Sequence, residues 1–378
     1  MTGNLPEEFG IEFKPSGQNS ISIESVLPAS FSDWDIIWHE CDYSTYFHSR
    51  EWAEVWSKYT NGKMVPTPFI VLFSDGKKAL LPFSCLKREG LAPMLMGTTT
   101  LYVSSPAFTY GGWISADKLD VNHAISLSNL IRKKFNSLYW KLNPYDDVIF
   151  NSDIRISEED ETHAINLEKG FAAIVSNISK GHRSAVSQAI RSGVSVRLSS
   201  SIQDWQDYYR VYEASVNRWG DRLIGGKYSW GLFHEIFNRD SPNVELWLSI
   251  YRERVIAGAL CFHSKRHVVY WHGGALSPYF NLRPVNLLLY EVIKSACEKG
   301  YAWFDFNPSG PLEGVKAFKE RFGAQALKCP IVKLRPRTIR AFAIEKVNGM
   351  LIEIHKKGKF KSLSQVVRPA LNEFLKNT

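Results

Sequence analysis

The chain has 378 residues, 44% of them apolar and 22% charged, which is typical of a soluble globular protein with room for two domains. Its five cysteines are odd in number and none stands in a CxxC pair, which excludes a disulfide framework and a CxxC zinc site and favours a reducing compartment. The first ten residues, MTGNLPEEFG, are unlike a signal peptide, and apolar runs such as PFIVLF are too short to cross a bilayer, so we expect a cytoplasmic protein.

Residues 1–30 are expected to form an irregular N-terminal segment, and residues 31–160 a first α/β unit. The expected elements of this unit are a helix over 49–60, a hairpin over 67–87, a strand region over 101–115, a helix over 124–137 and a strand over 138–144. Asp75-Gly76 stands between two apolar runs and is a strong turn signal for the hairpin.

Residues 161–335 are expected to form a second unit. In chain order it contains a basic helix and strand over 179–200, a helix over 202–219, two or three antiparallel strands over 244–275, an amphipathic helix over 283–300, a strand over 301–307, a short helix over 314–322 and a last strand over 327–336. The first unit has a looser version of this order, which indicates duplication of one α/β module. A cleft between two such units is a natural ligand site.

Residues 336–378 are expected to form a basic amphipathic helical tail. Counted from Lys333 to the C-terminus, there are eleven basic and three acidic residues, so residues 333–378 alone account for the net charge of +8. Its apolar residues recur at helical spacing: Ile344, Val347, Leu351 and Ile354. Such a tail could contact anionic lipid or nucleic acid, or it could be a solvated helical face.

Several motifs resemble those of the FemAB-like transferases, which are related to the GNAT superfamily. SKGHRSAVSQAIRSGVSV resembles the basic segment that opens the second domain of this family. ERVIAGALCF, YWHGGA, RPVNLLLYEVIKSACEKGYAWFDFN and EGVKAFKERFG, in this order, resemble its distal core, and FHSREWAEVW and YGGWIS are similar to its first domain. The resemblance covers roughly residues 40–335.

The resemblance implies an α/β (α+β) fold with tandem GNAT-like domains, each a mixed, mostly antiparallel sheet flanked by helices. It implies acyl transfer to an amine, as in the family's enzymes that pass amino acids from aminoacyl-tRNA to cell-wall precursors. Acetyl-CoA enzymes of the wider superfamily usually carry a (Q/R)xxGx(G/A) loop before a helix, which holds the pyrophosphate. Here SPYFNLRPVN contains no glycine, and RLIGGK ends in lysine, which weakens acetyl-CoA as the donor. Arg283 could still contact a phosphate.

Two residues are candidates for removing a proton from the attacking amine. Asp305 ends a strand between Phe304 and Phe306, where a partly dry setting would raise its pKa; the alternative is a structural aspartate that caps the loop. His272 in YWHGGA precedes two glycines that could allow a bulge and expose backbone donors to an oxyanion. The alternative for His272 is a satisfied histidine beside a turn.

A metal site is not expected. His263 and His267 form HxxxH, but a hairpin turn separates them and no acidic residue adjoins them in the sequence.

Basic residues are the main candidates for binding substrate phosphates. Lys180 and Arg183 open a helix, which suits the phosphate of a lipid- or nucleotide-linked sugar. Lys316 and Lys319 could hold a phosphate or the 3′ end of tRNA, or could face solvent. The full set of substrate-binding candidates is Lys180, Arg183, Tyr212, Arg218, Tyr270, Arg283, Asn307, Lys316 and Lys319.

The sequence thus favours an acyltransferase that transfers an acyl or aminoacyl group to an amine of a peptidoglycan or polysaccharide precursor. We expect no bound cofactor, a donor that is aminoacyl-tRNA or acyl-CoA, and a place in the cytoplasm or at the inner face of the membrane, which the basic tail could contact. One alternative is an acetyl-CoA-dependent N-acetyltransferase acting on a nucleotide- or lipid-linked amino sugar. A second is a non-catalytic protein that binds a membrane surface or nucleic acid.

Overall fold

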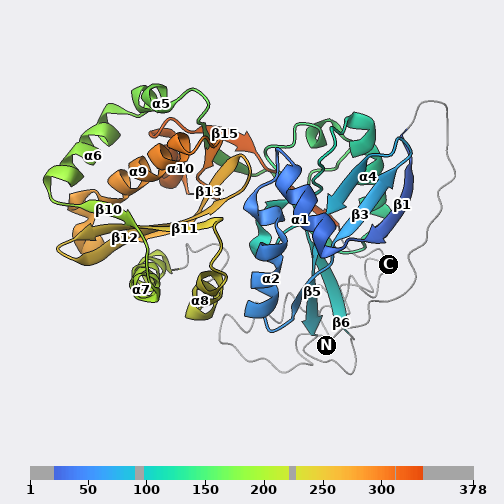
Figure 1. Ribbon diagram of the computed structural model, residues 1–378, viewed down its shortest axis with the longest axis horizontal. Helices are drawn as coiled ribbons and strands as arrows, with labels where there is room; N and C mark the ends of the chain where they lie inside the picture. Colours follow the sequence, from blue (N-terminus) through green and yellow to red (C-terminus); the bar gives the residue numbers. More distant parts are fainter. Residues whose placement is uncertain (1–20, 90–97, 221–226, 311, 335–378) are drawn as a thin grey trace, which may run out of the picture.

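A computed structural model describes residues 21–89, 98–220, 227–310 and 312–334, which form two α/β units lying side by side (Figure 1). The expected basic tail over 336–378 and most of RLIGGK lie outside the described residues. The expected irregular segment over 1–30 is wrong for residues 23–28, which form strand β1 and pair with β3. The mixed α/β fold class is confirmed.

The first unit contains strands in two sheets. Its elements are β1 (Ile23–Pro28), α1 (Phe31–Glu40), α2 (Arg50–Tyr59), β2 (Met64–Pro66), β3 (Phe69–Phe73), β4 (Lys78–Leu81), β5 (Ser84–Glu89), β6 (Thr98–Val103), β7 (Tyr110–Gly111), α4 (Val121–Lys134) and β8 (Leu138–Leu142). One sheet has the order β1-β3-β4, and the other has the order β16-β8-β6-β5-β2, with β7 paired to β8.

The second unit is built on one seven-stranded sheet of order β10-β11-β12-β13-β14-β9-β15. Its elements are β9 (Glu161–Asn166), α5 (Phe171–Asn177), α6 (Lys180–Arg191), β10 (Ser195–Leu198), α7 (Ile202–Trp219), α8 (Trp230–Asn238), β11 (Val244–Tyr251), β12 (Arg254–His263), β13 (His267–Ala275), the 3-10 helix η5 (Ser277–Leu282), α9 (Pro284–Glu298), β14 (Trp303–Asp305), α10 (Glu313–Glu320) and β15 (Gln325–Lys328). Helices α5, α6, α9 and α10 lie on one side of this sheet, and α7 and α8 on the other (Figure 1).

The single last strand expected over 327–336 is two strands in two sheets. β15 pairs with β9 in the second unit, whereas β16 (Ile331–Leu334) pairs with β8 in the first. Pro330 between them cannot donate a backbone hydrogen bond, which fits a break between two strands. The chain therefore returns to the first unit and ties the two sheets together.

An aromatic core continues from one unit into the other. Trp52 of α2 has its ring centroid 5.2 Å from those of both Phe262 of β12 and Trp271 of β13. Phe47 contacts Tyr110 and Phe262 in the same cluster, at 5.2 and 6.2 Å. Much of the high aromatic content is thus buried at the junction of the units, and residues placed there are held by both.

Candidate active site

Strands β13 and β14 part from each other midway along β13. They pair in parallel only from His267 to Val269 and from Trp303 to Asp305, after which β13 continues alone to Ala275. Leu260 pairs with His272 and Cys261 with Tyr270, so Trp271 is the extra residue of a β-bulge. On its β14 side, this part of β13 has no strand partner among the described residues. Bulges often re-aim side chains beside active sites, so we take this place as the candidate site.

Asp305 is fully buried at the end of β14 and accepts four hydrogen bonds. The Tyr110 and Tyr145 hydroxyls donate to Oδ2, at 2.5 and 2.7 Å. The Thr162 hydroxyl and the Asn307 backbone N–H donate to Oδ1, at 2.5 and 2.7 Å. The expectation of a carboxylate in a dry setting holds geometrically, but both oxygens are already engaged by the protein. This arrangement suits an anchor better than a proton acceptor.

Lys319 of α10 lies beside Asp305 rather than facing solvent. Its side chain is buried, and Nζ donates a hydrogen bond to the backbone carbonyl of Asn307. Burial lowers the pKa of Lys319 to about 8, although the nearby Asp305 charge opposes this shift. Asn307 has a left-handed φ of +63° and donates its side-chain N–H to the Trp271 carbonyl at 3.5 Å. Lys319 and Asp305 thus hold the loop after β14 against the bulge.

His272 lies in an aromatic surrounding next to the bulge. Its ring centroid is 4.4 Å from that of Tyr212, and Nδ1 is 2.9 Å from the Tyr208 hydroxyl. The same hydroxyl lies 3.1 Å from the His272 carbonyl, so both His272 atoms are within hydrogen-bond distance of Tyr208. Burial lowers the pKa of His272 to about 3, which keeps the ring neutral near pH 7.

Glycines 273 and 274 allow close packing within the second unit. A Cβ on Gly273 would lie 1.8 Å from the Tyr270 hydroxyl oxygen, and one on Gly274 would lie 2.6 Å from Ser215 Oγ. These contacts explain why small residues follow His272. In the loop after β14, the Ser309 hydroxyl is buried and has no hydrogen-bond partner within the described residues.

Apart from Lys319, the basic candidates are spread over the second unit and do not gather at the bulge. Arg183 donates to the carbonyls of Val175 and Ser176, at 3.3 Å each, and to that of Ile178, so it caps the end of α5. Lys316 Nζ pairs with Glu161 and Glu313, at 3.2 and 3.3 Å.

Two further candidates lie at helix starts. Lys180 is exposed at the start of α6, and Arg283 is exposed at the start of α9, where its φ is +56°.

The remaining candidates lie on helix α7 and strand β13. The Tyr212 hydroxyl accepts from the Tyr228 backbone N–H at 2.8 Å, and burial raises its pKa to about 12. Arg218 donates to the Ala275 carbonyl at 3.1 Å and to the Ser277 hydroxyl at 3.0 Å. Burial also raises the pKa of Tyr270. Of these, Tyr212 contacts His272 directly.

Sequence reasoning missed the partners that define the surroundings of Asp305 and His272. Tyr110, Tyr145 and Thr162 lie 195, 160 and 143 positions before Asp305, and Tyr208 lies 64 positions before His272. No local spacing links residues so far apart.

The HxxxH histidines do not face a common ligand. His263 Nε2 is 3.3 Å from the Glu245 carboxylate, and His267 Nδ1 is 3.0 Å from the Ser44 carbonyl. Within the described ranges, no group of three or more His, Cys, Asp or Glu residues could hold a metal ion. No helix in this part of the chain is long and apolar enough to span a membrane.

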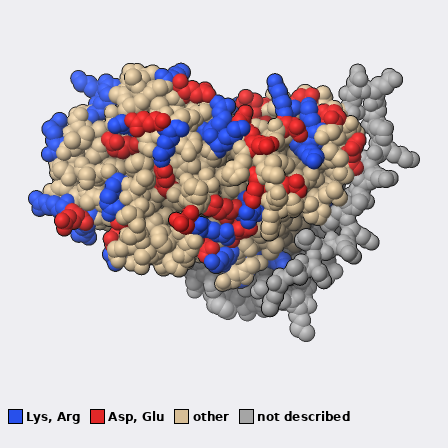
Figure 2. Space-filling model, viewed as in Figure 1, with Lys and Arg blue, Asp and Glu red and all other residues tan. Residues whose placement is uncertain are grey.

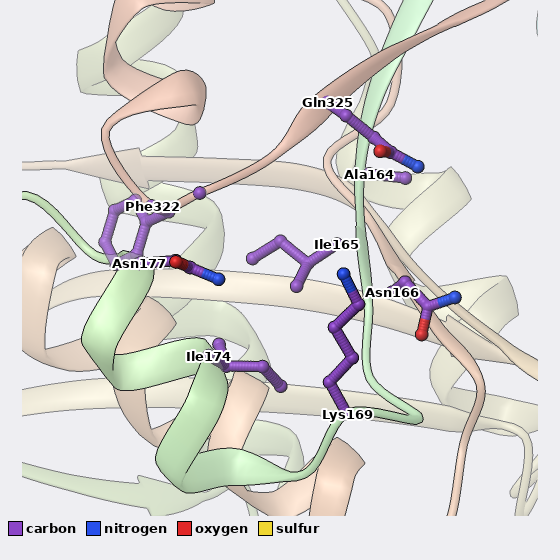
Figure 3. A pocket seen from close by; sticks show the side chains of 9 residues that line it. Ala164, Ile165, Asn166, Lys169, Ile174, Asn177, Phe322 and Gln325 are labelled. Atoms are coloured by element: carbon purple, nitrogen blue, oxygen red, sulfur yellow. The ribbon is translucent and has the colours of Figure 1, made fainter.

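A small pocket of about 70 Å³ lies on β9, away from the bulge (Figure 3). Its lining includes Asn166, Lys169 and Asn177, above an apolar floor that contains Ile165 and Ile174. Its lining runs along β9 from Asn166, which pairs with Trp303 at the start of β14, to Ala164, which pairs with Asp305 at its end.

Comparisons with known proteins agree with the fold. The model of an acetyltransferase (GNAT) domain matches residues 176–320. A search of curated proteins gave no match. The solved structure of FemX has a TM-score of 0.62 and 14% identity, covering 81% of this chain and 95% of that one.

Two further solved structures share the fold. The C-terminal domain of a putative lysylphosphatidylglycerol synthetase from Agrobacterium fabrum has a TM-score of 0.51 at 10% identity, covering 85% of this chain and 97% of that one. L-PGS from Bacillus licheniformis has a TM-score of 0.52 at 11% identity, covering 86% and 98%. The acetyltransferase (GNAT) model thus matches most of the second unit, and the fold is shared with FemX, which agrees with the FemAB-like resemblance of the sequence.

Proposed function

We propose that this acyltransferase transfers an acyl or aminoacyl group to an amine of a cell-envelope precursor, at the place where β13 parts from β14. The observation that carries the proposal is the edge of β13 beyond Val269, where no strand of the described residues pairs with the bulge at Trp271 on the β14 side. One protein that shares this fold is a putative lysylphosphatidylglycerol synthetase, whose name combines an aminoacyl group with a membrane lipid. This likeness supports an aminoacyl donor or a lipid-linked acceptor here.

The proposed reaction needs no covalent intermediate on the protein. The neutral amine nitrogen attacks the carbonyl carbon of the donor ester or thioester and forms the new N–C bond. Backbone N–H groups along the free edge of β13 stabilise the oxyanion. The C–O or C–S bond then breaks, and the proton lost by nitrogen passes to the leaving alcohol or thiol.

Asp305 and His272 have different roles in this proposal. Because four donors already occupy Asp305, we assign it to positioning the loop at Asn307, together with Lys319. His272 is neutral, so one ring nitrogen carries a lone pair that can accept a hydrogen bond from the amine and orient it. With a pKa of about 3, His272 is a weak base, and the amine reacts as the neutral species present in solution.

An ester donor such as aminoacyl-tRNA fits the start of α9 better than acetyl-CoA does. Pyrophosphate binding at a helix start uses free backbone N–H groups. Here the N–H groups of Asn286 and Leu287 are directed at the Arg283 carbonyl, at 3.2 and 3.5 Å, and that of Arg283 donates to Phe280. Titration calorimetry with acetyl-CoA tests the alternative of an acetyl-CoA-dependent N-acetyltransferase: tight binding would favour it.

Mass spectrometry of precursors tests the proposed reaction. The purified chain is incubated with amine-bearing nucleotide- or lipid-linked precursors and with aminoacyl-tRNA or acyl-CoA, and the mass of one acyl group should be gained. Asn307→Ala should slow the gain by roughly tenfold or more, because the loop loses its contact with Trp271. Asn122→Ala, at an exposed position on α4, is the matched control. Absence of a mass gain with every donor would refute the proposal.

A further inference from the structure

One end of the second unit carries arginines that have no acidic partner. Arg252 and Arg254 are exposed at the β11–β12 turn, and Arg283 is exposed between η5 and α9. Within the described part of the chain, none of these three guanidinium groups forms an ion pair, although Glu253 lies between two of them. Figure 2 shows Lys and Arg side chains gathered at the end of the molecule where α6 and the β11–β12 turn lie.

Aromatic rings lie directly beneath two of these cations. The Arg252 guanidinium is 5.2 Å from the centroid of the Tyr251 ring, and that of Arg254 is 5.8 Å from the Tyr279 ring. The two tyrosine rings are 6.0 Å apart, which joins the turn to η5. Phe280, the next residue of η5, is 42% exposed. Cations and rings therefore form one surface, the arginine–aromatic end: Tyr251, Arg252, Arg254, Tyr279, Phe280 and Arg283.

At this end, the backbone is left-handed at residues that seldom adopt that conformation. Arg252 and Glu253 have φ of +47° and +63°, so both central residues of the two-residue hairpin turn are left-handed. Asn-Gly or Asp-Gly is favoured at such a turn, because other residues are strained there. Arg283 is also left-handed, at +56°. Long charged side chains thus occupy three positions where small residues would be more stable, which indicates that the side chains serve a purpose.

We propose that the arginine–aromatic end docks on the surface of an anionic phospholipid membrane. Guanidinium groups attract anionic headgroups, and tyrosine and phenylalanine rings are suited to the headgroup level. Single-stranded RNA is less favoured, because it would stack bases on ring faces, and the faces of Tyr251 and Tyr279 carry the chain's own arginines. The surface goes beyond the proposed reaction and does not depend on it.

Docking in this way would present the candidate site to the membrane. Helix η5 directly follows β13, the strand whose free edge borders the candidate site. The arginine–aromatic end therefore continues from that strand, and a substrate held in the membrane would lie close to it.

Sedimentation of the full-length protein with vesicles tests the proposal. Vesicles contain either phosphatidylcholine alone or a mixture of phosphatidylglycerol and phosphatidylcholine. Arg252→Gln/Arg254→Gln/Arg283→Gln should lower partitioning onto the phosphatidylglycerol vesicles by roughly tenfold or more. The control Lys63→Gln/Lys87→Gln/Lys118→Gln removes the same charge from exposed positions of the first unit and should have a small effect. Thermal unfolding of both variants checks that each is folded.

Other outcomes would overturn the proposal. Equal loss of binding in both triple variants would mean that net charge alone drives binding, and unchanged binding in the arginine variant would place the contact elsewhere. Loss of binding to a single-stranded RNA oligonucleotide, with vesicle binding retained, would assign the surface to RNA. Phe280→Ala gives a second test: it should weaken vesicle binding even at high salt, because an apolar contact is not screened. Catalytic turnover enters none of these measurements.

Discussion

The Tyr110 hydroxyl donates a hydrogen bond of 2.5 Å to Asp305 Oδ2 and so joins strand β7 of the first unit to strand β14 of the second. Both residues are fully buried, and burial together with the Asp305 charge raises the pKa of Tyr110 well above its ordinary value. Tyr145 donates to the same oxygen from the loop after β8. A buried carboxylate is costly unless it is hydrogen-bonded, so the two units stabilise each other through Asp305.

Removing the Tyr110 hydroxyl should therefore destabilise the whole chain. Tyr110→Phe leaves a buried carboxylate with one donor fewer, at a cost of about 2 kcal/mol in the free energy of unfolding. Urea unfolding of purified protein measures this cost. Tyr139→Phe is the matched control, because its hydroxyl makes no hydrogen bond within the described residues. Equal stability of the two variants would show that Asp305 does not tie the units.

Asp305→Asn distinguishes an anchor from a catalytic base. As an anchor, Asp305 should be needed for stability more than for chemistry, since its oxygens are occupied by four donors. We expect the variant to unfold at lower urea concentration while turnover per folded molecule falls less than tenfold. Unfolding curves and turnover measured on the same preparation check this. A fully stable variant whose turnover falls by a factor of a thousand would show that Asp305 is the catalytic base.

Local patterns predicted most elements of the fold. The helix expected over 202–219 is α7, because Trp205, Tyr208, Tyr212 and Ser215 mark one buried face. Asp75-Gly76 correctly located the β3–β4 hairpin. Helix α1 was missed, although Trp34, Ile37 and Trp38 are its buried residues and stand at helical spacing.

Contacts between distant segments could not be predicted in this way. The return of β16 to the first sheet and the donors around Asp305 depend on packing between the units, which no sequence period encodes. The apolar neighbours of Asp305 in the sequence predicted a buried polar residue at a strand end. Whether Asp305 and His272 are free or already hydrogen-bonded could not be predicted, because their partners lie more than sixty positions away.

Asp146 should make stability depend on pH in the neutral range. It is buried, Oδ2 has no hydrogen-bond partner in the described residues, and burial raises its pKa from 3.8 to about 7. Because the folded state binds the Asp146 proton more tightly than the unfolded state does, protonated Asp146 contributes its whole stabilisation below pH 3.8. This contribution is lost as the pH rises from 3.8 to about 7. The loss is on the order of 4 kcal/mol.

Asp146→Asn should remove this dependence. The variant mimics the protonated acid, so its stability relative to the natural chain should grow between pH 4 and pH 7 and stay constant above. Urea unfolding at a series of pH values gives the difference in free energy of unfolding between the variant and the natural chain. The titration of other groups cancels in this difference. A difference that does not vary with pH would contradict the raised pKa of the buried Asp146 carboxyl.

Lys319 should make the free energy of unfolding rise with pH in the alkaline range, opposite to the effect of Asp146. Burial lowers its pKa from 10.5 to about 8, so between these values the unfolded chain binds a proton that the folded chain does not. Stability should therefore rise with pH across this window, by about 3 kcal/mol. Lys319→Met should lose the rise, whereas Lys316→Met, at an ion-paired surface position, should keep it. Parallel curves for the natural chain and Lys319→Met would refute the prediction.

Gly258→Ala should disturb the candidate site through Tyr208. A Cβ on Gly258 would lie 2.3 Å from Tyr208 Cδ2, and Tyr208 is fully buried, so the ring must shift. Overpacking of this kind costs about 1–3 kcal/mol. The shift would also move the hydroxyl that contacts His272 Nδ1 and the His272 carbonyl. We expect a lower unfolding midpoint and a changed nuclear magnetic resonance signal of the His272 ring.

Gly181→Ala supplies the matched comparison for this substitution. Gly181 lies in helix α6, and a Cβ there would meet nothing within 4 Å. Alanine has the higher helix propensity and reduces the entropy of the unfolded chain, so this variant should gain up to about 1 kcal/mol. The His272 signal should stay unchanged in it. If Gly258→Ala were as stable as Gly181→Ala, the close contact of α7 with β12 would not be what holds Tyr208 against His272.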